Sequence, residues 1–352
     1  MFWEKEGKLI YSYDGETVCI EAWGKDALRV RATKNRSFTG RDWALEAKDA
    51  HAGEVEIFED PSAKGGAFAN MYEGTDTSYG KITNGKLHAV IDSGSVITFY
   101  HEDGRVLLKE HFRRLRDEES MPLNIMGREY SNGVGDNFRI VTRFVARKGE
   151  KIFGMGQYQQ HELDLKGCML ELAQRNSQVS VPFYLSSIGY GFLWNNPGVG
   201  QVMFANNGTE WVTESGKEID YLVIAGDTPA EIEENYMTLT GKPPMMPEYG
   251  MGFWQCKLRY WNQEQLLSVA RKYKELGVPL DVIVVDFFHW TKQGEFKFDP
   301  KYWPDVPGMC RELKEMGIQV VVSVWPTVDI YSENFEEMKE KGYLVRTEHG
   351  VP

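Results

Sequence analysis

A proline-rich stretch, residues 242–247 (KPPMMP), divides the chain into two parts with different hydrophobic patterns. Short alternating segments separated by turn residues precede it, whereas apolar runs alternating with amphipathic helical segments follow it. Because proline cannot donate a hydrogen bond to a helix or a central strand, this stretch is typical of a connection between domains. We therefore predict one domain over residues 1–240 and a second over residues 241–352.

The first part of the chain has the pattern of an antiparallel β structure. Residues 28–32 (LRVRA) alternate between apolar and basic side chains. Residues 83–86 (TNGK) separate two short apolar runs, and Asn-Gly predicts a tight type I′ hairpin because both residues tolerate positive φ. Residues 101–104 (HEDG) join two further runs in the same way. Such segments continue to about residue 235, so we predict a β-sandwich.

Strands and helices alternate in the second part. Continuous apolar runs predict strands buried on both faces at residues 251–255, 280–287 and 318–324. N-capping residues (Asn262, Asp305 and Ser332) and glycine stops predict the helices 263–276, 306–316 and 333–341. A fourth strand is expected to begin at residues 343–345. This alternation, with a repeat of about 30–37 residues, indicates a parallel sheet with right-handed crossovers.

The turn after the first of these strands decides between two parallel folds. Residues 256–261 (CKLRYW) contain no glycine, whereas a dinucleotide-binding open sheet needs a glycine-rich turn at this point. A (β/α)8 barrel fits better, and such barrels bind their ligands at the carboxyl ends of the strands. The predicted fold is therefore a β-sandwich followed by about the first three βα units of a (β/α)8 barrel.

Two side chains at the predicted strand ends are the main site candidates. Asp286 follows the apolar run 280–285, and an ionised carboxylate at such a position has to be hydrogen-bonded or paired. We interpret it as an acceptor for two adjacent sugar hydroxyls; capping of the next loop, pairing with a lysine and metal ligation are the alternatives. Trp325, at the end of the third strand, either forms a wall of the site or packs inside the barrel.

Four further residues are candidates for the same site. Lys257 and Arg259, in the first loop, either donate to sugar hydroxyls or are solvated charges. Trp290 either lines the site or covers the sheet, and His289 is either a site residue or a histidine satisfied within its loop. No cluster of His, Cys, Asp or Glu accompanies Asp286 at metal-ligand spacing, so we expect neither a metal nor a cofactor.

Composition narrows the class of partner. A net charge of −12 argues against nucleic acid or an anionic membrane as the main partner, and the apolar runs are too short to span a bilayer. Aromatic residues make up 13% of the chain, which suits both large cores and sugar-binding surfaces. The first residues lack the pattern of a secretory signal. Together with four widely separated cysteines, this predicts a cytoplasmic protein.

Several motifs taken together resemble family 31 of the glycoside hydrolases, most clearly from about residue 150 onward. The motifs are FGMGQ at 153–157, VPFY at 181–184 with GYG at 189–191, GFWQ at 252–255, residues 281–290, FDP at 298–300 with WPD at 303–305, and SVWP at 323–326. The resemblance implies a galactose-mutarotase-like sandwich before the barrel. It also implies a retaining α-glycosidase that removes α-xylose or α-glucose from non-reducing ends.

The resemblance also implies roles for individual residues. The family's strand-two aspartate, which binds hydroxyls of the terminal sugar, falls on Asp286, and its strand-three tryptophan, which lines the same subsite, falls on Trp325. Lys257 and Arg259 are the nearest candidates for a substrate contact in the first loop. The resemblance places the nucleophile after strand four and the acid/base after strand six, so both are expected beyond Pro352.

Without those two residues, we expect this chain alone to be inactive. Retaining hydrolysis needs two carboxyl groups about 5–5.5 Å apart. The alternatives are a non-catalytic carbohydrate-binding protein, an α-glucan lyase or a transglycosylase on the same scaffold. An oligosaccharide or glycoside is the expected partner, and assembly into a homo-oligomer is left open.

Overall fold

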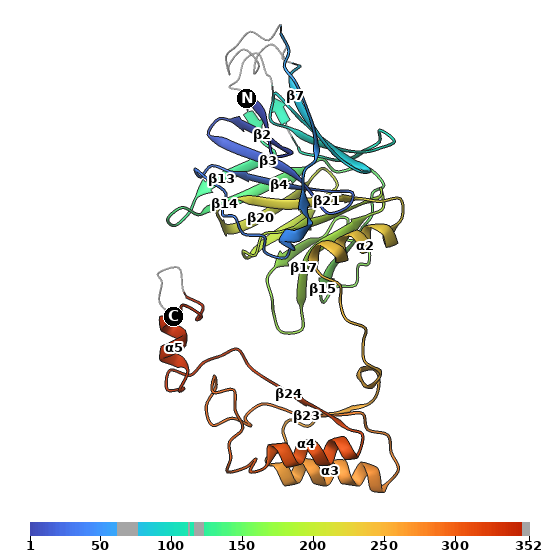
Figure 1. The fold of residues 1–352 in the computed structure, drawn as a ribbon, viewed down its shortest axis with the longest axis vertical. Coiled ribbons are helices and arrows are strands. Elements are labelled where there is room, and N and C mark those ends of the chain that lie inside the picture. The colour runs from blue at the N-terminus through green and yellow to red at the C-terminus, as the bar shows by residue number, and fades with distance from the viewer. Residues whose placement is uncertain (62–76, 112, 116–122, 347–352) are drawn as a thin grey trace. The chain divides into compact units, whose positions relative to one another are not determined.

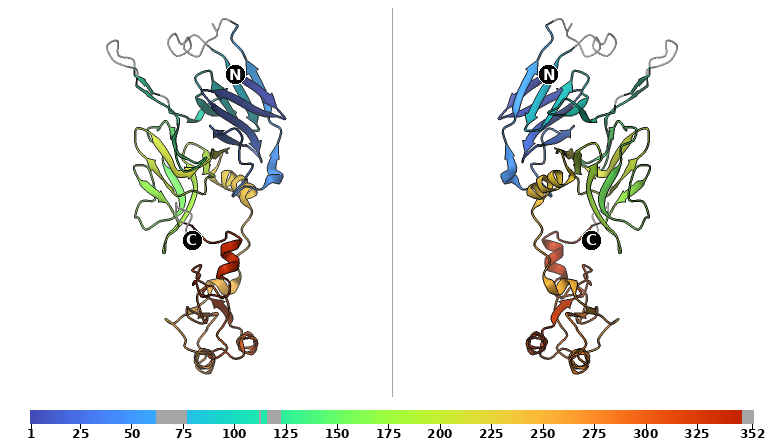
Figure 2. Two further views of the ribbon diagram at one scale, coloured as in Figure 1. Left: turned by 90° about the vertical axis from the view of Figure 1, so that its left-hand side faces the viewer. Right: turned by 90° about the vertical axis from the view of Figure 1, so that its right-hand side faces the viewer.

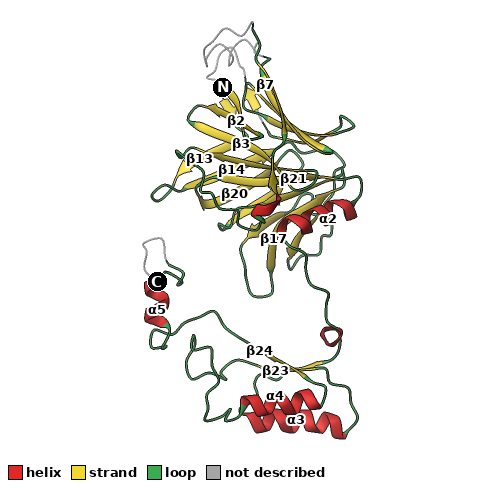
Figure 3. Cartoon of the chain, viewed as in Figure 1, coloured by secondary structure: helices red, strands yellow, loops and turns green. Residues whose placement is uncertain are grey.

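The computed structural model describes residues 1–61, 77–111, 113–115 and 123–346 (Figure 1). The chain divides into two compact units, Met1–Pro243 and Pro244–Pro352. Unit 1 is built almost entirely of strands, whereas unit 2 alternates strands with helices (Figure 3). No helix among the described residues combines the length and the apolar character needed to cross a membrane.

The largest sheet of unit 1 has nine strands. Residues far apart in the chain meet at its centre, where Leu28 lies opposite Val223 in an antiparallel pair. The strands along the sheet are β1 (Phe2–Lys5), β2 (Lys8–Tyr13), β3 (Glu16–Trp23), β4 (Ala27–Thr33), β21 (Ile219–Ala225), β18 (Tyr190–Trp194), β17 (Val179–Ser186) and β15 (Ile152–Gln157), with β5 (Ala50–His51) beside β3.

Three smaller antiparallel sheets contain the other described strands of unit 1. One contains β10 (Val106–Lys109), β9 (Ile97–His101), β8 (Leu87–Asp92), β7 (Tyr79–Asn84) and β6 (Glu54–Phe58). Another contains β13 (Arg128–Asn132), β14 (Phe138–Phe144), β20 (Thr209–Gly216), β19 (Gly200–Phe204) and β16 (Met169–Leu172). The third is the pair β11 (Arg113–Leu115) and β12 (Leu123–Ile125).

Aromatic rings fill the space between the sheets of unit 1. The Phe192 ring lies 5.1 Å from that of Trp211 and 5.2 Å from that of Tyr221, and Trp194 stacks on Trp211 at 5.5 Å. All four side chains are fully buried. Large buried rings contribute more apolar area than any other side chain, so part of the aromatic content serves the core.

The β7–β8 hairpin differs in detail from the sequence prediction. Its two turn residues are Gly85 and Lys86, one residue later than an Asn-Gly turn, and of the two only Gly85 has a positive φ, of 55°. The type I′ prediction is therefore wrong. Asn84 belongs to the strand, and its amide donates hydrogen bonds to the carbonyl oxygens of Gly24 (2.7 Å) and Ala27 (2.8 Å). A long-range contact thus overrides the local turn preference.

One helix covers part of unit 1. α2 (Pro229–Thr240) starts as the sequence predicts: the Thr228 hydroxyl accepts a hydrogen bond from the Glu231 amide at 3.2 Å, and proline occupies the first turn. Ile232 and Leu239 on its inner face are buried against the nine-stranded sheet. A short 3-10 helix, η1 (Ala47–Asp49), lies elsewhere in the same unit.

A fully buried ion pair lies within the nine-stranded sheet. The Arg29 guanidinium on β4 donates to both oxygens of the Asp220 carboxylate on β21, at 3.0 and 2.7 Å. The amide of Asn195 donates to the same carboxylate at 2.9 Å, and Arg29 also reaches Asp42 at 2.8 Å. A buried charge is tolerated only when its hydrogen-bonding capacity is satisfied, and here four side chains satisfy one another.

Unit 2 contains three parallel strands. β22 (Trp254–Gln255) pairs with β23 (Val282–Val285), which pairs with β24 (Gln319–Val322). The two helices α3 (Gln263–Glu275) and α4 (Val306–Glu315) lie side by side (Figures 1 and 2). Apolar side chains of both helices and of β23 form the core of the unit: Leu266, Leu267, Ala270, Ile283, Val285, Met309 and Leu313. The remaining elements are η2 (Glu248–Met251) and α5 (Phe335–Glu340).

The sequence predicted the positions of these elements more accurately than the residues at which they begin and end. β22 has only two residues, and β24 ends at Val322 rather than Val324. α5 begins at Phe335 after Asn334, although Ser332 still accepts a hydrogen bond from the Asn334 amide at 3.3 Å. Residues 343–345 form no strand. Helix ends agree well where a side chain caps the helix: Asn262 and Asp305 each accept an amide hydrogen bond at 2.9 Å.

Replacing Arg29 by Met tests the buried ion pair. Loss of the guanidinium leaves the Asp220 charge buried with Asn195 as its remaining partner, so the free energy of unfolding should fall by about 3–5 kcal/mol. Urea unfolding followed by far-UV circular dichroism measures the change. The control is Arg139→Met, which removes an exposed ion pair with Glu214 (3.3 Å) and should cost less than about 1 kcal/mol. Equal losses in both variants would contradict this account.

Candidate functional site

Asp286 lies directly after β23, where the strand ends. One carboxylate oxygen accepts a hydrogen bond from the Phe287 amide at 2.8 Å, and the other lies 3.9 Å from the Cys256 sulfur, just after β22. Within the described residues no lysine or arginine forms an ion pair with it, so pairing with a lysine is not how this charge is accommodated. The second oxygen keeps room to accept further hydrogen bonds.

Trp325 contacts the aromatic residues that follow Asp286 in the chain. Its ring stacks on Phe287 at 5.4 Å with an interplanar angle of 18°, and lies 6.3 Å from Phe288 and 6.1 Å from Trp290. The Trp325 side chain nevertheless remains 40% exposed. The loops after β23 and β24 therefore build one aromatic surface next to a carboxylate.

Arg259 is fixed against the same loop. Its guanidinium lies 3.9 Å from the ring centre of Trp261 and 5.0 Å from that of Phe288, and donates to the Phe288 carbonyl oxygen at 3.4 Å. Guanidinium groups over aromatic faces gain cation–π attraction, so this side chain is held in place rather than freely solvated. Lys257 is exposed, and in the described part of the chain its ammonium group makes no hydrogen bond or ion pair.

His289 and Trp290 lie beneath this surface. Both are buried, and the imidazole packs between Trp290 and Phe298, with ring centres 4.7 Å away on each side. The Nδ1 atom lies 3.1 Å from the Asp286 carbonyl oxygen. Burial lowers the pKa of His289, which favours the neutral ring. A mainly apolar hollow of about 180 Å³ adjoins these residues and Trp325.

The structure thus brings five of the six candidates together: Asp286, Trp325, Arg259, His289 and Trp290. No hydrogen bond, ion pair or cation–π contact joins the Lys257 side chain to these five described residues.

Sequence reasoning missed two participants, Phe288 and Cys256. Phe288 has a φ of 60°, a left-handed conformation that an aromatic residue adopts only at a cost of about 1–3 kcal/mol. The contacts with Arg259 hold it there. The run of aromatic residues after Asp286 was the available signal for Phe288, whereas nothing in the sequence indicated Cys256.

Metal chemistry has no evident centre in this unit. Among the described residues, no three His, Cys, Asp or Glu side chains are grouped so that they could ligate an ion. The three strand ends carry one carboxylate, Asp286, beside exposed aromatic rings. Such an arrangement can accept hydrogen bonds from a polar ligand and pack against its apolar face.

Comparison with known protein families shows which family the chain belongs to. Residues 17–202 match the glycosyl hydrolase 31 N-terminal galactose mutarotase-like domain, and residues 243–352 match the glycosyl hydrolases family 31 TIM-barrel domain. The chain belongs to glycosyl hydrolase family 31. This finding confirms the family resemblance and the predicted combination of a galactose-mutarotase-like sandwich with part of a (β/α)8 barrel.

Several family 31 proteins are similar over much of the chain. An uncharacterized family 31 glucosidase of Pseudescherichia vulneris is 42% identical over 99% of this chain and 64% of its own length. An alpha-xylosidase of Saccharolobus solfataricus is 36% identical over 59% of this chain and 30% of its own. The crystal structure of an alpha-xylosidase from a soil metagenome, complexed with xylose, is 46% identical with a TM-score of 0.86. This chain covers 51% of that protein's length.

Alkylation of Cys256 tests the contact between its thiol and Asp286. Burial and, next, the Asp286 carboxylate raise the pKa of the Cys256 thiol, and the thiolate is the reactive form. Asp286→Asn should therefore speed the reaction of Cys256 with iodoacetamide several-fold near neutral pH, as followed by mass spectrometry of peptides. Cys310, exposed on α4, is the internal control and should react at an unchanged rate. An unchanged rate at Cys256 would show that the carboxylate does not lie beside the thiol.

Proposed function

We propose that the strand ends of unit 2 bind the terminal sugar of an α-linked glycoside, as part of a retaining α-glycosidase of the α-xylosidase or α-glucosidase type. The observation that carries the proposal is the Asp286 carboxylate, which has no ion-pair partner among the described residues, directly before Phe287, on which the exposed ring of Trp325 stacks. Membership of family 31 supports it, as does the xylose complex of the similar metagenomic enzyme.

Each candidate residue has a distinct part in this proposal. Asp286 accepts hydrogen bonds from two neighbouring sugar hydroxyls, because an ionised carboxylate offers only acceptors. Trp325 packs against the C–H face of the pyranose. Arg259, held by its aromatic contacts, and Lys257 donate to other hydroxyls. His289 and Trp290 are too deeply buried to offer much surface, and we propose that they support the loop that carries Asp286.

We further propose that the bond-breaking groups come from strands other than the three described here. Retaining hydrolysis requires a nucleophilic carboxylate and an acid/base carboxyl group about 5–5.5 Å apart. Asp286 is one carboxylate, and its proposed role is to bind hydroxyls. The chain spans 64% and 51% of the lengths of two of its relatives, so a complete barrel in this family extends beyond the three βα units described here.

We also propose a cytoplasmic location. The four cysteines are unpaired in the structure, as expected where thiols are kept reduced. The proposed partner is a neutral glycoside rather than an anionic polymer, consistent with the net charge of −12.

A pair of matched variants tests the role of Asp286. Asp286→Asn should weaken xylose binding by about tenfold or more, because a hydrogen bond to a charged group contributes about 1.5–3 kcal/mol. The control is Asp281→Asn, at the opposite end of the same strand, where the carboxylate accepts a hydrogen bond from the Phe253 amide at 3.0 Å. Isothermal titration calorimetry measures both affinities. Equal weakening in the two variants would rule out a sugar contact at Asp286.

Turnover by the 352-residue chain tests where the chemistry lies. The chain should release no aryl alcohol from aryl α-xyloside or aryl α-glucoside, because Asp286 cannot act both as the hydroxyl acceptor and as the two catalytic carboxyl groups. A polypeptide that joins these residues to a complete family 31 barrel should hydrolyse one of the two substrates. Hydrolysis by the 352-residue chain itself would disprove the proposed division of roles.

A further inference from the structure

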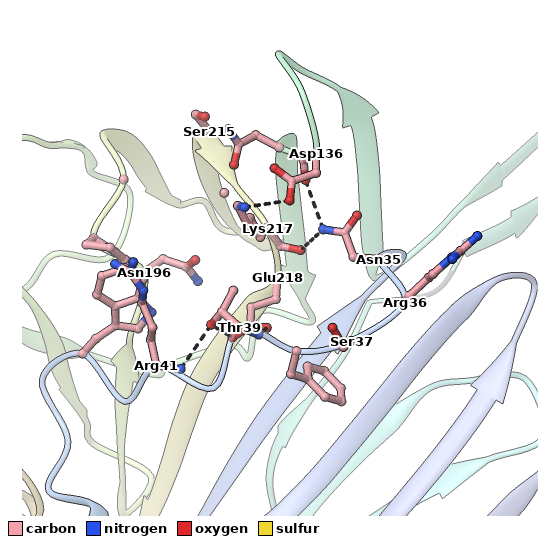
Figure 4. A pocket seen from close by; sticks show the side chains of 16 residues that line it. Asn35, Arg36, Ser37, Thr39, Arg41, Asp136, Asn196, Ser215, Lys217 and Glu218 are labelled. Carbon is pink, nitrogen blue, oxygen red and sulfur yellow. Dashed lines mark hydrogen bonds and ion pairs between the residues drawn. The ribbon is translucent and has the colours of Figure 1, made fainter. Parts of the chain in front are cut away.

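Unit 1 contains a larger cavity than the strand-end hollow of unit 2, and none of the residues discussed as the glycosidase site line it. Its volume is about 780 Å³, within the range of cavities that bind small molecules. Its wall is made by four segments that are distant in sequence: 35–43, 136–137, 196–198 and 215–218, the last of which includes the end of β20 (Figure 4).

The buried ion pair of unit 1 holds one wall of this cavity. Besides binding Asp220, the Arg29 guanidinium donates to the Arg41 carbonyl oxygen at 2.9 Å and to the Asp42 carboxylate at 2.8 Å. The Asn195 amide donates to the Asp42 carbonyl oxygen at 3.1 Å. A loop fixed by charge-assisted hydrogen bonds from the protein interior presents its side chains in a set position, which lowers the entropic cost of binding.

Two of the charged side chains of the wall form an ion pair, and a third, Glu218, is hydrogen-bonded within the wall. Both oxygens of the buried Glu218 carboxylate accept hydrogen bonds from Thr39, at 2.8 and 2.9 Å. Lys217 pairs with Asp136 at 2.6 Å, and Asn35 bridges the same two segments (Figure 4). Lys217 is therefore already paired with a carboxylate of the same wall.

An exposed tryptophan stands at the edge of this polar wall. Trp43 lines the cavity and is 45% exposed, and the Arg41 guanidinium lies 5.2 Å from its ring centre. The hydroxyl and amide groups of Ser37, Ser215 and Asn196 line the same space. Figure 4 shows Arg36, by contrast, directed away from the other labelled side chains.

We propose that this cavity binds a neutral oligosaccharide, independently of the strand-end site of unit 2. The C–H face of one pyranose packs on the Trp43 ring, which the Arg41 stacking holds in orientation. Hydroxyls of the same and the next residue bond to the amide of Asn196 and the serine hydroxyls, which both donate and accept. The face of the Trp43 ring and the uncharged serine and asparagine groups suit a neutral sugar, because neither kind of contact needs a charge on the ligand.

Titration of the 352-residue chain with isomaltotriose tests the proposal. Trp43→Ala should weaken binding at least about tenfold, the size of loss expected when a tryptophan anchor is truncated. The matched control is Trp3→Ala, on β1, because Trp3 is similarly exposed at 37% but does not line the cavity. Ser215→Trp, which fills the cavity from an exposed position, should abolish the same binding without removing a core contact.

A third variant distinguishes binding in the cavity from binding at the strand-end site. Asp286→Asn should leave the Trp43-dependent binding unchanged, so this proposal and the proposed glycosidase site can fail separately. The cavity proposal is overturned if the chain binds no isomaltotriose, if Trp43→Ala and Ser215→Trp bind as the unaltered chain does, or if Asp286→Asn alone removes all binding. Displacement of the trisaccharide by inorganic phosphate would equally overturn the assignment of a neutral ligand.

Discussion

The parallel register of three short strands determines where the candidate site residues of unit 2 lie. Trp254 lies opposite Val282, and Val282 lies opposite Gln319, so β22, β23 and β24 end at one edge. The strand interiors are apolar, and a carboxylate is therefore tolerated only where a strand stops. Asp286 and Trp325 are far apart in sequence, yet this pairing brings the loops that carry them into contact. The loops can vary while the sheet keeps their starting points fixed.

Much of this arrangement could be predicted from the sequence, because it depends on periodicity. Continuous apolar runs located the strands, and the residues that follow each run include the candidate side chains. What periodicity does not encode is contact between side chains of different loops. Arg259 could equally have been a solvated charge, and only the structure shows it stacked on Trp261 and Phe288.

Unit 1 shows a second limit of sequence patterns. The alternation in residues 28–32 is typical of a strand with one solvated face, yet Arg29 is completely buried. The other side chains of the cluster, Asp42, Asn195 and Asp220, come from three separate segments, so no local pattern reveals the cluster. The same cluster fixes the loop that lines the large cavity, and the stability of the sandwich and the shape of that cavity therefore depend on one buried charge pair. The β7–β8 turn shows the same effect at smaller scale, since long-range hydrogen bonds by Asn84 displace the preferred turn.

We propose that Asp286 and Trp325 form a sugar site at the strand ends. A crystal structure of the 352-residue chain grown with xylose tests this claim most directly. We expect xylose to bind with two adjacent hydroxyls within hydrogen-bond distance of the Asp286 carboxylate and with its ring against the exposed face of Trp325. Xylose bound elsewhere on the chain, with Asp286 free of any sugar contact, would contradict it.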